Sequence, residues 1–550
     1  MGLEGRLVEV EADISQGLSA FTIVGLGDAA VQEAKERVRS AIKNSGFKYP
    51  YTKKIINLAP ANLKKHGPQF DLPIAAGLLA ASGQLDAGRL ADTLVIGELA
   101  LDGSVRPVNG VLTMALFARA AGWGRMIVPA GNFEEAALVK NVKIVPVSCL
   151  REIFDGTAPA QNQNGLQKPK NSDKSVSGHN SRIEIIDDKL SKSVQFAADK
   201  SPTAESRTFP DFPGSSTHTD LPDFSDIHGL ENAKRALVVA AAASHHLLLS
   251  GPPGTGKTML AKALPGIMPP LTGEEMLEVL QIYSCAGLFE KSATTSARPF
   301  RQVHPTCSLL ALTGGGTNLK PGEISLAHHG VLFLDEIAEF PRAHLESLRQ
   351  PLEAREIHLS RASGSLKFPA NFMLVAGMNP CPCGYHGDPV KECKCRPYQI
   401  IQYNKKLSGP ILDRIDLVID VPRQPVKIFG EEPGESSAQV REKVIRARQI
   451  QHERFAVADK SRDSREGPHT HQNHAIRTNS QMTAADIKKI IRLNKDCDDY
   501  LREAGEKFHF SGRSFHQILK TARTIADLSA HDEIAVEELL EAVQYRTGKS

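Results

Sequence analysis

Residues 251–258 form the pattern that most restricts how this 550-residue chain can fold. The pattern fits G-x-x-x-x-G-K-[ST], whose glycines let backbone N–H groups turn inward around phosphate oxygens. The apolar run Leu247–Ser250 before it predicts a short buried strand, and a helix is expected to start near Lys257. Strand, loop and helix in this order predict a doubly wound parallel sheet that binds ligands at the carboxyl ends of its strands. The expected nucleotide-binding residues are Gly251, Pro252, Pro253, Gly254, Thr255, Gly256, Lys257 and Thr258.

Two acidic residues follow a second buried-strand run, Val331–Leu334. Such a strand delivers carboxylates to the edge of the sheet where the phosphate loop lies. We expect Lys257 to neutralise the β- and γ-phosphates of ATP, and Thr258 and Asp335 to hold Mg²⁺. Glu336 would polarise the attacking water. The alternative for the acidic pair is the solvated start of a loop.

Three further polar residues are candidates for the same site. Asn379 follows the predicted strand Phe372–Ala376, where its amide would reach the γ-phosphate or the water, although Asn before Pro is also a common turn. Arg414 precedes the predicted strand Leu417–Val421, and Arg513 opens a predicted helix near the C-terminus. Each arginine has the alternative of an ordinary surface position.

The chain divides by composition into several parts, as its length requires. In residues 1–153, strand runs (Leu7–Val10, Ile55–Leu58, Leu94–Ile96, Met126–Pro129) mix with helical stretches (Asp28–Ser45, Pro73–Ala81, Val111–Ala121). Residues 154–220 are polar and predict a flexible linker. Residues 221–425 hold the predicted sheet, including a helix over Glu231–Ser244. Residues 426–550 predict a helical domain, with helices over Gln439–Arg454, Thr483–Ala504, Ser514–Ser529 and Val536–Tyr545.

Charge and cysteine usage narrow the class of protein. No apolar run approaches the roughly 20 residues that a bilayer span needs, so we expect a cytoplasmic protein without a membrane partner. The net charge of +3 neither favours nor excludes nucleic acid. Four of the eight cysteines crowd together as Cys381, Cys383, Cys393 and Cys395. Four thiolates suit tetrahedral Zn²⁺, although C-x-C is tighter than the usual ligand spacing, and reduced thiols in a loop are the alternative.

These motifs, in this order, resemble the YifB/ComM family of magnesium-chelatase-related AAA+ proteins. The resemblance runs across nearly the whole chain. It is carried by Phe21-Thr-Ile-Val-Gly-Leu, Asn57-Leu-Ala-Pro, Phe70-Asp-Leu-Pro, Pro321-Gly-Glu-Ile-Ser-Leu-Ala-His, Leu348-Arg-Gln-Pro-Leu-Glu and Gly409-Pro-Ile-Leu-Asp-Arg-Ile-Asp.

The resemblance implies an α/β AAA+ P-loop sheet with a helical C-terminal lid, assembled as a homo-hexameric ring motor. It implies that Asn379 is sensor 1, Arg414 the arginine finger given to a neighbour and Arg513 sensor 2. ComM-type members drive branch migration of DNA in natural transformation, so single-stranded or branched DNA is the expected partner. Two strands within 356–368 resemble the hairpin that faces the pore in DNA motors, and we expect Arg361 and Lys367 to bind phosphates. A solvated basic hairpin is the alternative.

The N-terminal region resembles the proteolytic domain of Lon, of ribosomal S5 domain 2-like fold, through Gly97-Glu-Leu-Ala-Leu-Asp-Gly-Ser-Val-Arg. The serine of Lon would fall at Gln69 and its lysine near Leu112, so Ser–Lys chemistry is not available. Relatives have a further strand before Gly2, and we expect this domain to lack it.

Four functions compete at this point. A DNA motor ranks first, and this ranking rests on the resemblance. The residues themselves define the ATPase site but not the substrate on which the motor acts. A metal-inserting motor like magnesium chelatase is weakened because this chain contains no metal-sensing partner domain. An ATP-dependent protease is disfavoured by Gln69 and Leu112. A non-enzymatic adaptor is disfavoured by the intact Lys257 and Glu336.

Overall fold

The computed structural model describes residues 3, 5–156, 221–289, 296–316, 319–361, 364–407, 409–424, 434–460 and 477–547. Most of the predicted linker, from residue 157 to 220, lies outside these ranges. The chain forms two compact units. The first comprises Met1–Phe212, Leu280–Thr294 and Ser360–Leu366, and the second comprises Pro213–Val279, Thr295–Leu359 and Lys367–Ser550.

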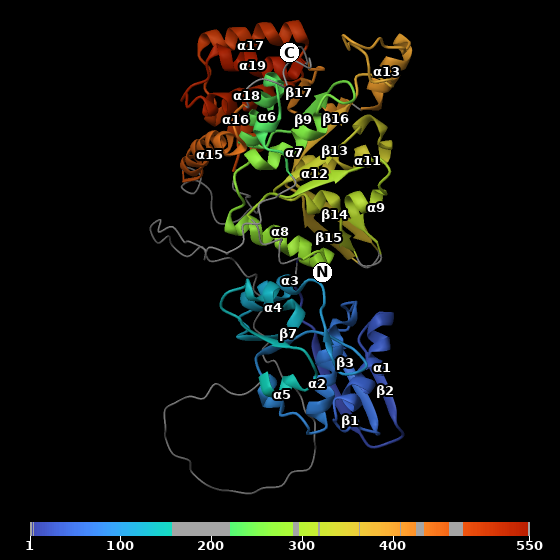
Figure 1. Cartoon of the computed structure of the whole chain (residues 1–550). Coiled ribbons are helices and arrows are strands. Elements are labelled where there is room, and N and C mark those ends of the chain that lie inside the picture. Colours follow the sequence, from blue (N-terminus) through green and yellow to red (C-terminus); the bar gives the residue numbers. More distant parts are fainter. Residues whose placement is uncertain are drawn as a thin grey trace. The chain divides into compact units, whose positions relative to one another are not determined.

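Two three-stranded sheets and the small pair β5-β6 build the N-terminal part of the first unit (Figure 1). One three-stranded sheet has the order β1-β3-β2 and the other, wholly parallel, the order β4-β7-β8. Helix α2, apolar on nearly all sides, packs on β1, and α1 packs on α2. The elements are β1 (Glu9–Ser15), β2 (Ala20–Val24), α1 (Ala29–Asn44), β3 (Lys53–Ala59), α2 (Asp71–Ala81), β4 (Thr93–Val95), β5 (Glu98–Leu99), β6 (Val105–Arg106), α3 (Val111–Ala120), β7 (Arg125–Pro129), α4 (Phe133–Ala137), β8 (Lys143–Val147) and α5 (Glu152–Gly156).

The first strand differs from the sequence prediction of Leu7–Val10. Strand β1 runs from Glu9 to Ser15 because its register with β3 begins at the pair Glu9 and Ala59. Its charged residues Glu11 and Asp13 are exposed. Alternation of this kind is typical of an antiparallel strand with one solvated face.

A five-stranded parallel sheet forms the centre of the second unit, as predicted (Figure 1). Its strand order is β10-β13-β16-β9-β17, and every neighbouring pair is parallel. All residues of β13 and β16 are buried, as a central strand covered on both faces requires. The strands are β9 (Leu247–Ser250), β10 (Phe300–Val303), β13 (Val331–Leu334), β16 (Met373–Met378) and β17 (Leu417–Asp420). The sequence prediction did not include β10.

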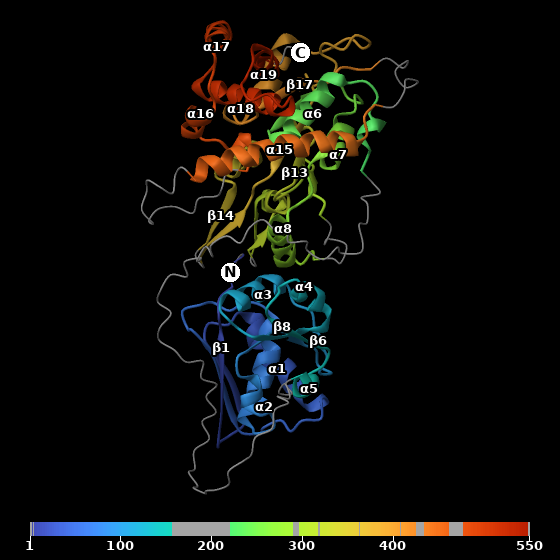
Figure 2. The ribbon, with the colours of Figure 1, turned by 90° about the vertical axis from the view of Figure 1, so that its left-hand side faces the viewer.

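Helices and a hairpin surround this sheet. The long helix α15 packs against both α6 and α7 (Figure 2). The hairpin pairs β14 with β15, as predicted. These elements are α6 (Glu231–Ala243), α7 (Lys257–Ile267), α8 (Gly273–Ala286), α9 (Leu309–Thr313), α10 (Glu323–Leu326), α11 (Arg342–Ser347), α12 (Arg349–Ala354), β14 (Glu356–Arg361), β15 (Gly364–Pro369), α13 (Pro397–Lys406) and α14 (Gly409–Leu412), with two-residue strands β11 (Gly314–Gly315) and β12 (Lys320–Pro321).

The C-terminal region is helical, as predicted, with one correction. The stretch Thr483–Ala504 is two helices rather than one, because α16 ends at Ile490 and the side chain of Asn494 caps α17 by accepting the N–H of Cys497 at 2.8 Å. The helices are α15 (Ser437–Lys460), α16 (Ala484–Ile490), α17 (Lys495–Phe508), α18 (Gly512–Leu528) and α19 (Val536–Thr547). Among the described residues, no helix is both long and apolar enough to cross a bilayer.

Candidate nucleotide site

The phosphate loop leaves the end of β9 and enters α7. Gly254 and Gly256 have φ of 78° and 90°, a left-handed backbone that glycine adopts without a Cβ penalty. The Nζ of Lys257, a residue that is 8% exposed, donates to the carbonyls of Gly251 at 2.6 Å and Pro252 at 2.9 Å. Burial lowers the pKa of Lys257, while the nearby charges of Asp335 and Glu336 oppose that shift. The loop therefore holds a buried cation directly at the start of a helix, where anions bind.

The acidic pair directly follows the buried strand β13, which β16 separates from β9. Thr258 Oγ1 donates to Asp335 Oδ2 at 3.1 Å, which places a hydroxyl and a carboxylate together at the edge of the sheet. Oxygen ligands of this kind suit Mg²⁺, so these two residues would hold it. Glu336 is exposed and has a φ of 51°, a left-handed conformation that is uncommon for a residue with a Cβ. Such backbone outliers cluster at functional sites.

Strand order explains why Asn379 joins these residues. Its strand β16 lies between β13, which Asp335 follows, and β9, which leads into the phosphate loop. Lys257 Nζ donates to Asn379 Oδ1 at 3.2 Å. A Cβ at Gly377 would lie 3.0 Å from Asp335 Oδ1, so a larger residue there would crowd the carboxylate. Five residues predicted from separate motifs thus meet at one edge of the sheet: Lys257, Thr258, Asp335, Glu336 and Asn379.

The two candidate arginines meet on one carboxylate. Arg414 and Arg513 bind Glu353 Oε1 at 2.7 Å and 2.8 Å. Arginine charge and hydrogen bonding hold the pKa of Glu353 below its usual value, with the Arg513 hydrogen bond as the main cause. No sequence pattern indicates Glu353 as the shared partner of the two arginines.

The four clustered cysteines are arranged as a metal would require. Their Sγ atoms all lie within 4.8 Å of one another. Three of the separations are 3.4 Å (Cys381 to Cys383), 3.7 Å (Cys381 to Cys393) and 3.6 Å (Cys383 to Cys393). A tetrahedral zinc with Zn–S bonds of about 2.3 Å would separate its sulfurs by about 3.8 Å. The donor set therefore fits zinc.

This cysteine cluster also contacts the phosphate loop. A Cβ at Gly384, which has a φ of 84°, would lie 2.7 Å from Pro253 Cδ and 3.9 Å from the Asn379 side chain. Backbone N–H groups, first that of Tyr385, lower the pKa of the Cys383 thiol to about 6. The cluster can thus influence the nucleotide site through direct packing.

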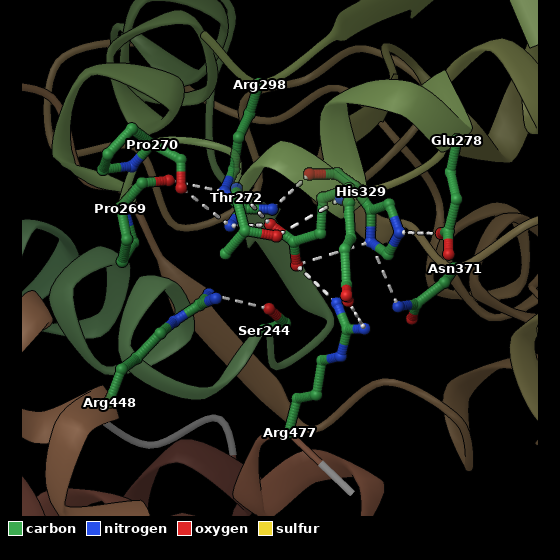
Figure 3. Close-up of polar contacts among 12 residues, drawn as sticks. Ser244, Pro269, Pro270, Thr272, Glu278, Arg298, His329, Asn371, Arg448 and Arg477 are labelled. Carbon is green, nitrogen blue, oxygen red and sulfur yellow. Dashed lines mark hydrogen bonds and ion pairs between the residues drawn. The ribbon is translucent and has the colours of Figure 1, made fainter. Parts of the chain in front are cut away.

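A buried ionic cluster lies near the amino ends of the same strands (Figure 3). Arg298 is 6% exposed and donates to Pro269 O at 2.6 Å and His329 O at 2.7 Å. It also binds Glu275 Oε2 at 3.0 Å, and Arg477 approaches the other oxygen of Glu275 at 3.4 Å. The pairing and hydrogen bonds offset part of the desolvation cost of burying Arg298 and Glu275, and the contact from Arg477 joins the C-terminal region to the base of the sheet.

Two adjacent histidines extend this cluster. His328 Nε2 and His329 Nε2 lie 3.1 Å and 2.6 Å from Glu278 Oε2, and His328 Nδ1 accepts the N–H of Asn371 at 3.0 Å. The three side chains have metal-ligating atoms. Both imidazoles donate to the carboxylate, however, and these hydrogen bonds account for the arrangement without a metal ion.

The Lon-like positions carry no nucleophile or base. Gln69 donates its amide to His66 O at 2.6 Å. Leu112 is fully buried, and its backbone N–H donates to the carboxylate of Glu135 at 2.9 Å. Both residues therefore serve local structure.

The parallel sheet, phosphate loop and acidic pair define a P-loop nucleotide-binding domain. Three family models match the chain: "Magnesium chelatase, subunit ChlI" over residues 223–428, "Subunit ChlI of Mg-chelatase" over 10–132, and "Magnesium chelatase, subunit ChlI C-terminal" over 434–546.

Two full-length relatives are similar to the chain. Competence protein ComM of Haemophilus influenzae is 40% identical over 549 residues, which cover 99% of this chain and 96% of that protein. The protein YifB of Escherichia coli is 39% identical over 549 residues, covering 99% and 95%. A shorter match joins 30% of the chain to 22% of the peroxisomal Lon protease homolog 2 of Bos taurus, at 27% identity.

The chain belongs to the magnesium-chelatase-related family of AAA+ ATPases that includes ComM and YifB. Membership implies ATPase activity with ATP and Mg²⁺.

Proposed function

We propose that the chain is an ATP-driven ring motor that acts on DNA, a helicase that promotes branch migration during recombination or natural transformation. The ATPase activity in this proposal is supported by one observation: the side chains of four predicted site residues contact one another at one edge of the sheet. They are Lys257, Thr258, Asp335 and Asn379. DNA as the substrate of the motor is supported by the 40% identical relative named competence protein ComM.

Each site residue has a role in this proposal. Lys257 binds the β- and γ-phosphates, and Asn379, which is already beside Lys257, orients the γ-phosphate or the water. Thr258 and Asp335 hold Mg²⁺, which when bound offsets charge on the phosphates. Glu336 accepts the proton of the attacking water, and its exposed position leaves its carboxylate free to face that water.

A neighbouring subunit would supply a second cation, besides Lys257, to offset the charge on the γ-phosphate during hydrolysis. Arg414 lies just before β17 and would reach the γ-phosphate of a neighbouring subunit in a homo-hexamer, as an arginine finger. Arg513 would act as sensor 2 from the start of α18. Both arginines bind Glu353, so both would have to exchange this partner for phosphate oxygens during the cycle.

DNA would contact the hairpin of β14 and β15. Lys367 pairs with Glu356 of the facing strand at 3.3 Å and is 61% exposed, so it remains accessible to a phosphate. The side chain of Arg361 lies outside what the structure describes. Reversing both charges to Glu should reduce DNA affinity and flatten its salt dependence, whereas unchanged binding would place the DNA path elsewhere.

The remaining proposals concern zinc, the N-terminal domain and location. We assign structural Zn²⁺ to Cys381, Cys383, Cys393 and Cys395, because their sulfur separations fit a tetrahedral ion. We assign residues 1–153 to a Lon-like, non-proteolytic domain, 154–220 to a linker, 221–425 to the ATPase core and 426–550 to the lid. None of the eight cysteines forms a disulfide, which suits a reducing cytoplasm.

Branch migration of a labelled four-way junction tests the proposal. The protein with ATP and Mg²⁺ should convert the junction into two duplexes, and the Glu336→Gln variant should bind the junction without converting it. If the active ATPase leaves every junction and partial duplex unchanged, the DNA-motor function is wrong.

A metal-chelatase-like or protein-remodelling ATPase is the second candidate, favoured by the magnesium chelatase models that match the chain. Metalation of a porphyrin, or ATP-dependent unfolding of a protein substrate, in the absence of any DNA effect would support it.

A further inference from the structure

A cavity of about 240 Å³ lies in the N-terminal domain, far in sequence from the phosphate loop. Helix α1, strands β2 and β3 and the loop before β3 form its walls. The lining residues that matter here are Lys35, Glu36, Arg39, Tyr49, Tyr51 and Lys54. The volume is below the about 300–1,000 Å³ of pockets that enclose drug-sized ligands, so it suits a small group.

Lys54, which lines this cavity, is unusual because it is a buried lysine. It shares a face of β3 with Ile56 and Leu58, which are fully buried, and it is itself only 1% exposed. Its Nζ donates to Pro50 O at 2.8 Å and Thr52 O at 2.6 Å. These carbonyls satisfy two of its three protons but do not neutralise its charge.

No carboxylate within the described ranges forms an ion pair with Lys54, and burial lowers its pKa. A buried cation is costly unless an anion compensates it.

The other charges at the cavity do not supply that anion in full. Lys35 and Arg39 project from α1, and neither forms an ion pair within the residues the structure describes. Glu36 is the one acidic residue of the lining, against three basic ones. The cavity therefore carries an excess of positive charge.

Aromatic rings stand beside these cations. Lys54 Nζ lies 4.8 Å from the centre of the Tyr49 ring, and Lys43 Nζ lies 5.2 Å from that of Tyr51. Tyr51 is 66% exposed, an unusual position for a large ring. A hydrogen bond from Lys43 and the charges of Lys43 and Arg39 lower the pKa of Tyr51. A cationic hollow with an exposed ring at its rim has the chemistry of single-stranded nucleic-acid sites.

We propose that this cavity binds a phosphate of single-stranded nucleic acid, with Lys35, Arg39 and Lys54 on the phosphate and Tyr51 stacked on an adjacent base. This inference rests on the proposed DNA-motor function, and it assigns the N-terminal domain a share in DNA binding. The exposed ring favours a nucleic-acid strand over free phosphate, which would leave Tyr51 unused.

Fluorescence anisotropy of the full chain with a fluorescein-labelled oligo-dT tests the site. The Lys35→Glu/Arg39→Glu variant should bind at least tenfold more weakly. Loss of this one phosphate contact should also reduce the slope of log K against log salt by about 0.7. The control Arg119→Glu/Lys143→Glu makes the same charge change at exposed positions of the same domain and should bind like wild type.

Stacking is tested separately at the rim. Tyr51→Ala should weaken binding about five- to hundredfold, and Tyr51→Phe should retain it. Basal ATP hydrolysis without DNA and the thermal midpoint should stay unchanged in all these variants.

The outcomes separate this inference from the proposed function. If wild type binds oligo-dT and the Lys35/Arg39 variant matches its control, the cavity is not the site, while the DNA motor stands. If wild type binds inorganic phosphate through these residues but not oligo-dT, the nucleic-acid occupant is wrong. If DNA neither binds nor stimulates hydrolysis, both proposals fail together.

Discussion

Lys257 Nζ lies 3.2 Å from Asn379 Oδ1, although the two residues are 122 positions apart in sequence. The contact joins the phosphate loop to the strand between it and the acidic pair. If Lys257 moves with the γ-phosphate, its contact with Asn379 would therefore shift Asn379 and the cysteine cluster that follows it in sequence.

Nucleotide binding and hydrolysis should separate between Lys257 and Glu336. Lys257→Ala removes a direct phosphate contact, so it should weaken binding of a fluorescent ATP analogue. Glu336→Gln leaves the phosphates in place but removes the base, so it should bind normally and lower the hydrolysis rate by about 10²–10⁴-fold. Wild-type turnover by Glu336→Gln would show that another group activates the water.

Mixed rings test the shared site. Arg414→Ala and Lys257→Ala proteins should each be nearly inactive, since an arginine finger contributes about 10³–10⁵ in rate in other NTPases. Mixed, they form some interfaces with an intact loop and an intact finger, so activity should partly return. Arg342→Ala, at a side chain that is 88% exposed, is the control and should keep full turnover. Full turnover by Arg414→Ala would move the finger to another arginine.

Zinc content tests the cysteine cluster. Mass spectrometry of unchelated protein should find about one zinc per chain, and Cys393→Ser/Cys395→Ser should lose it. Because Gly384 packs against Pro253, loss of zinc should also lower ATP turnover. Cys307→Ser, outside the cluster, should keep both. Well under one zinc per chain in the wild type would refute the assignment.

Acid should destabilise the ATPase core through two histidines, the buried His328 and the partly buried His246. Burial lowers the pKa of His246 and of His328 from the ordinary 6.5 to about 4. The unfolded state then binds more protons between pH 6.5 and 4, so this stability is complete above 6.5 and is lost as the pH falls. At pH 5.0 the loss is about 2 kcal/mol per histidine.

Thermal midpoints at pH 7.5 and 5.0 measure this effect. In both histidines Nδ1 accepts a backbone N–H, a bond that asparagine can also accept. His246→Asn or His328→Asn should therefore show a smaller pH-dependent drop than wild type, and the exposed His509→Asn should show the same drop as wild type. Equal drops in all four proteins would exclude His246 and His328 as the cause.

Local patterns predicted the centre of this molecule well. The strands Leu247–Ser250 and Val331–Leu334 match the structure residue for residue, because continuous apolar runs beside a glycine loop and an acidic pair leave few alternatives. Strand β10, Phe300-Arg-Gln-Val, was not predicted because its two central residues are polar and interrupt the apolar run that marks a buried strand. Polar residues are tolerated there because β10 lies at the edge of the sheet. The break before Asn494 was missed because a cap depends on one side chain within a helical pattern.

Long-range charge pairing was not predictable. Nothing near Glu353 in sequence indicates that Arg414 and Arg513 would share its carboxylate, since that contact depends on how α12, α14 and α18 pack. Lys54 likewise reads as an ordinary polar residue of a strand until its burial is known. Residue spacing in the sequence identifies motifs, whereas the residues that contact those motifs are known only from the structure.

The central claim is that ATP hydrolysis at Lys257 and Glu336 drives work on DNA. Steady-state hydrolysis with and without single-stranded and branched DNA, at one fixed salt concentration, tests it most directly. DNA should increase the hydrolysis rate severalfold in the wild type and leave that of Glu336→Gln unchanged. A wild-type rate that is substantial yet identical with and without every DNA would contradict it.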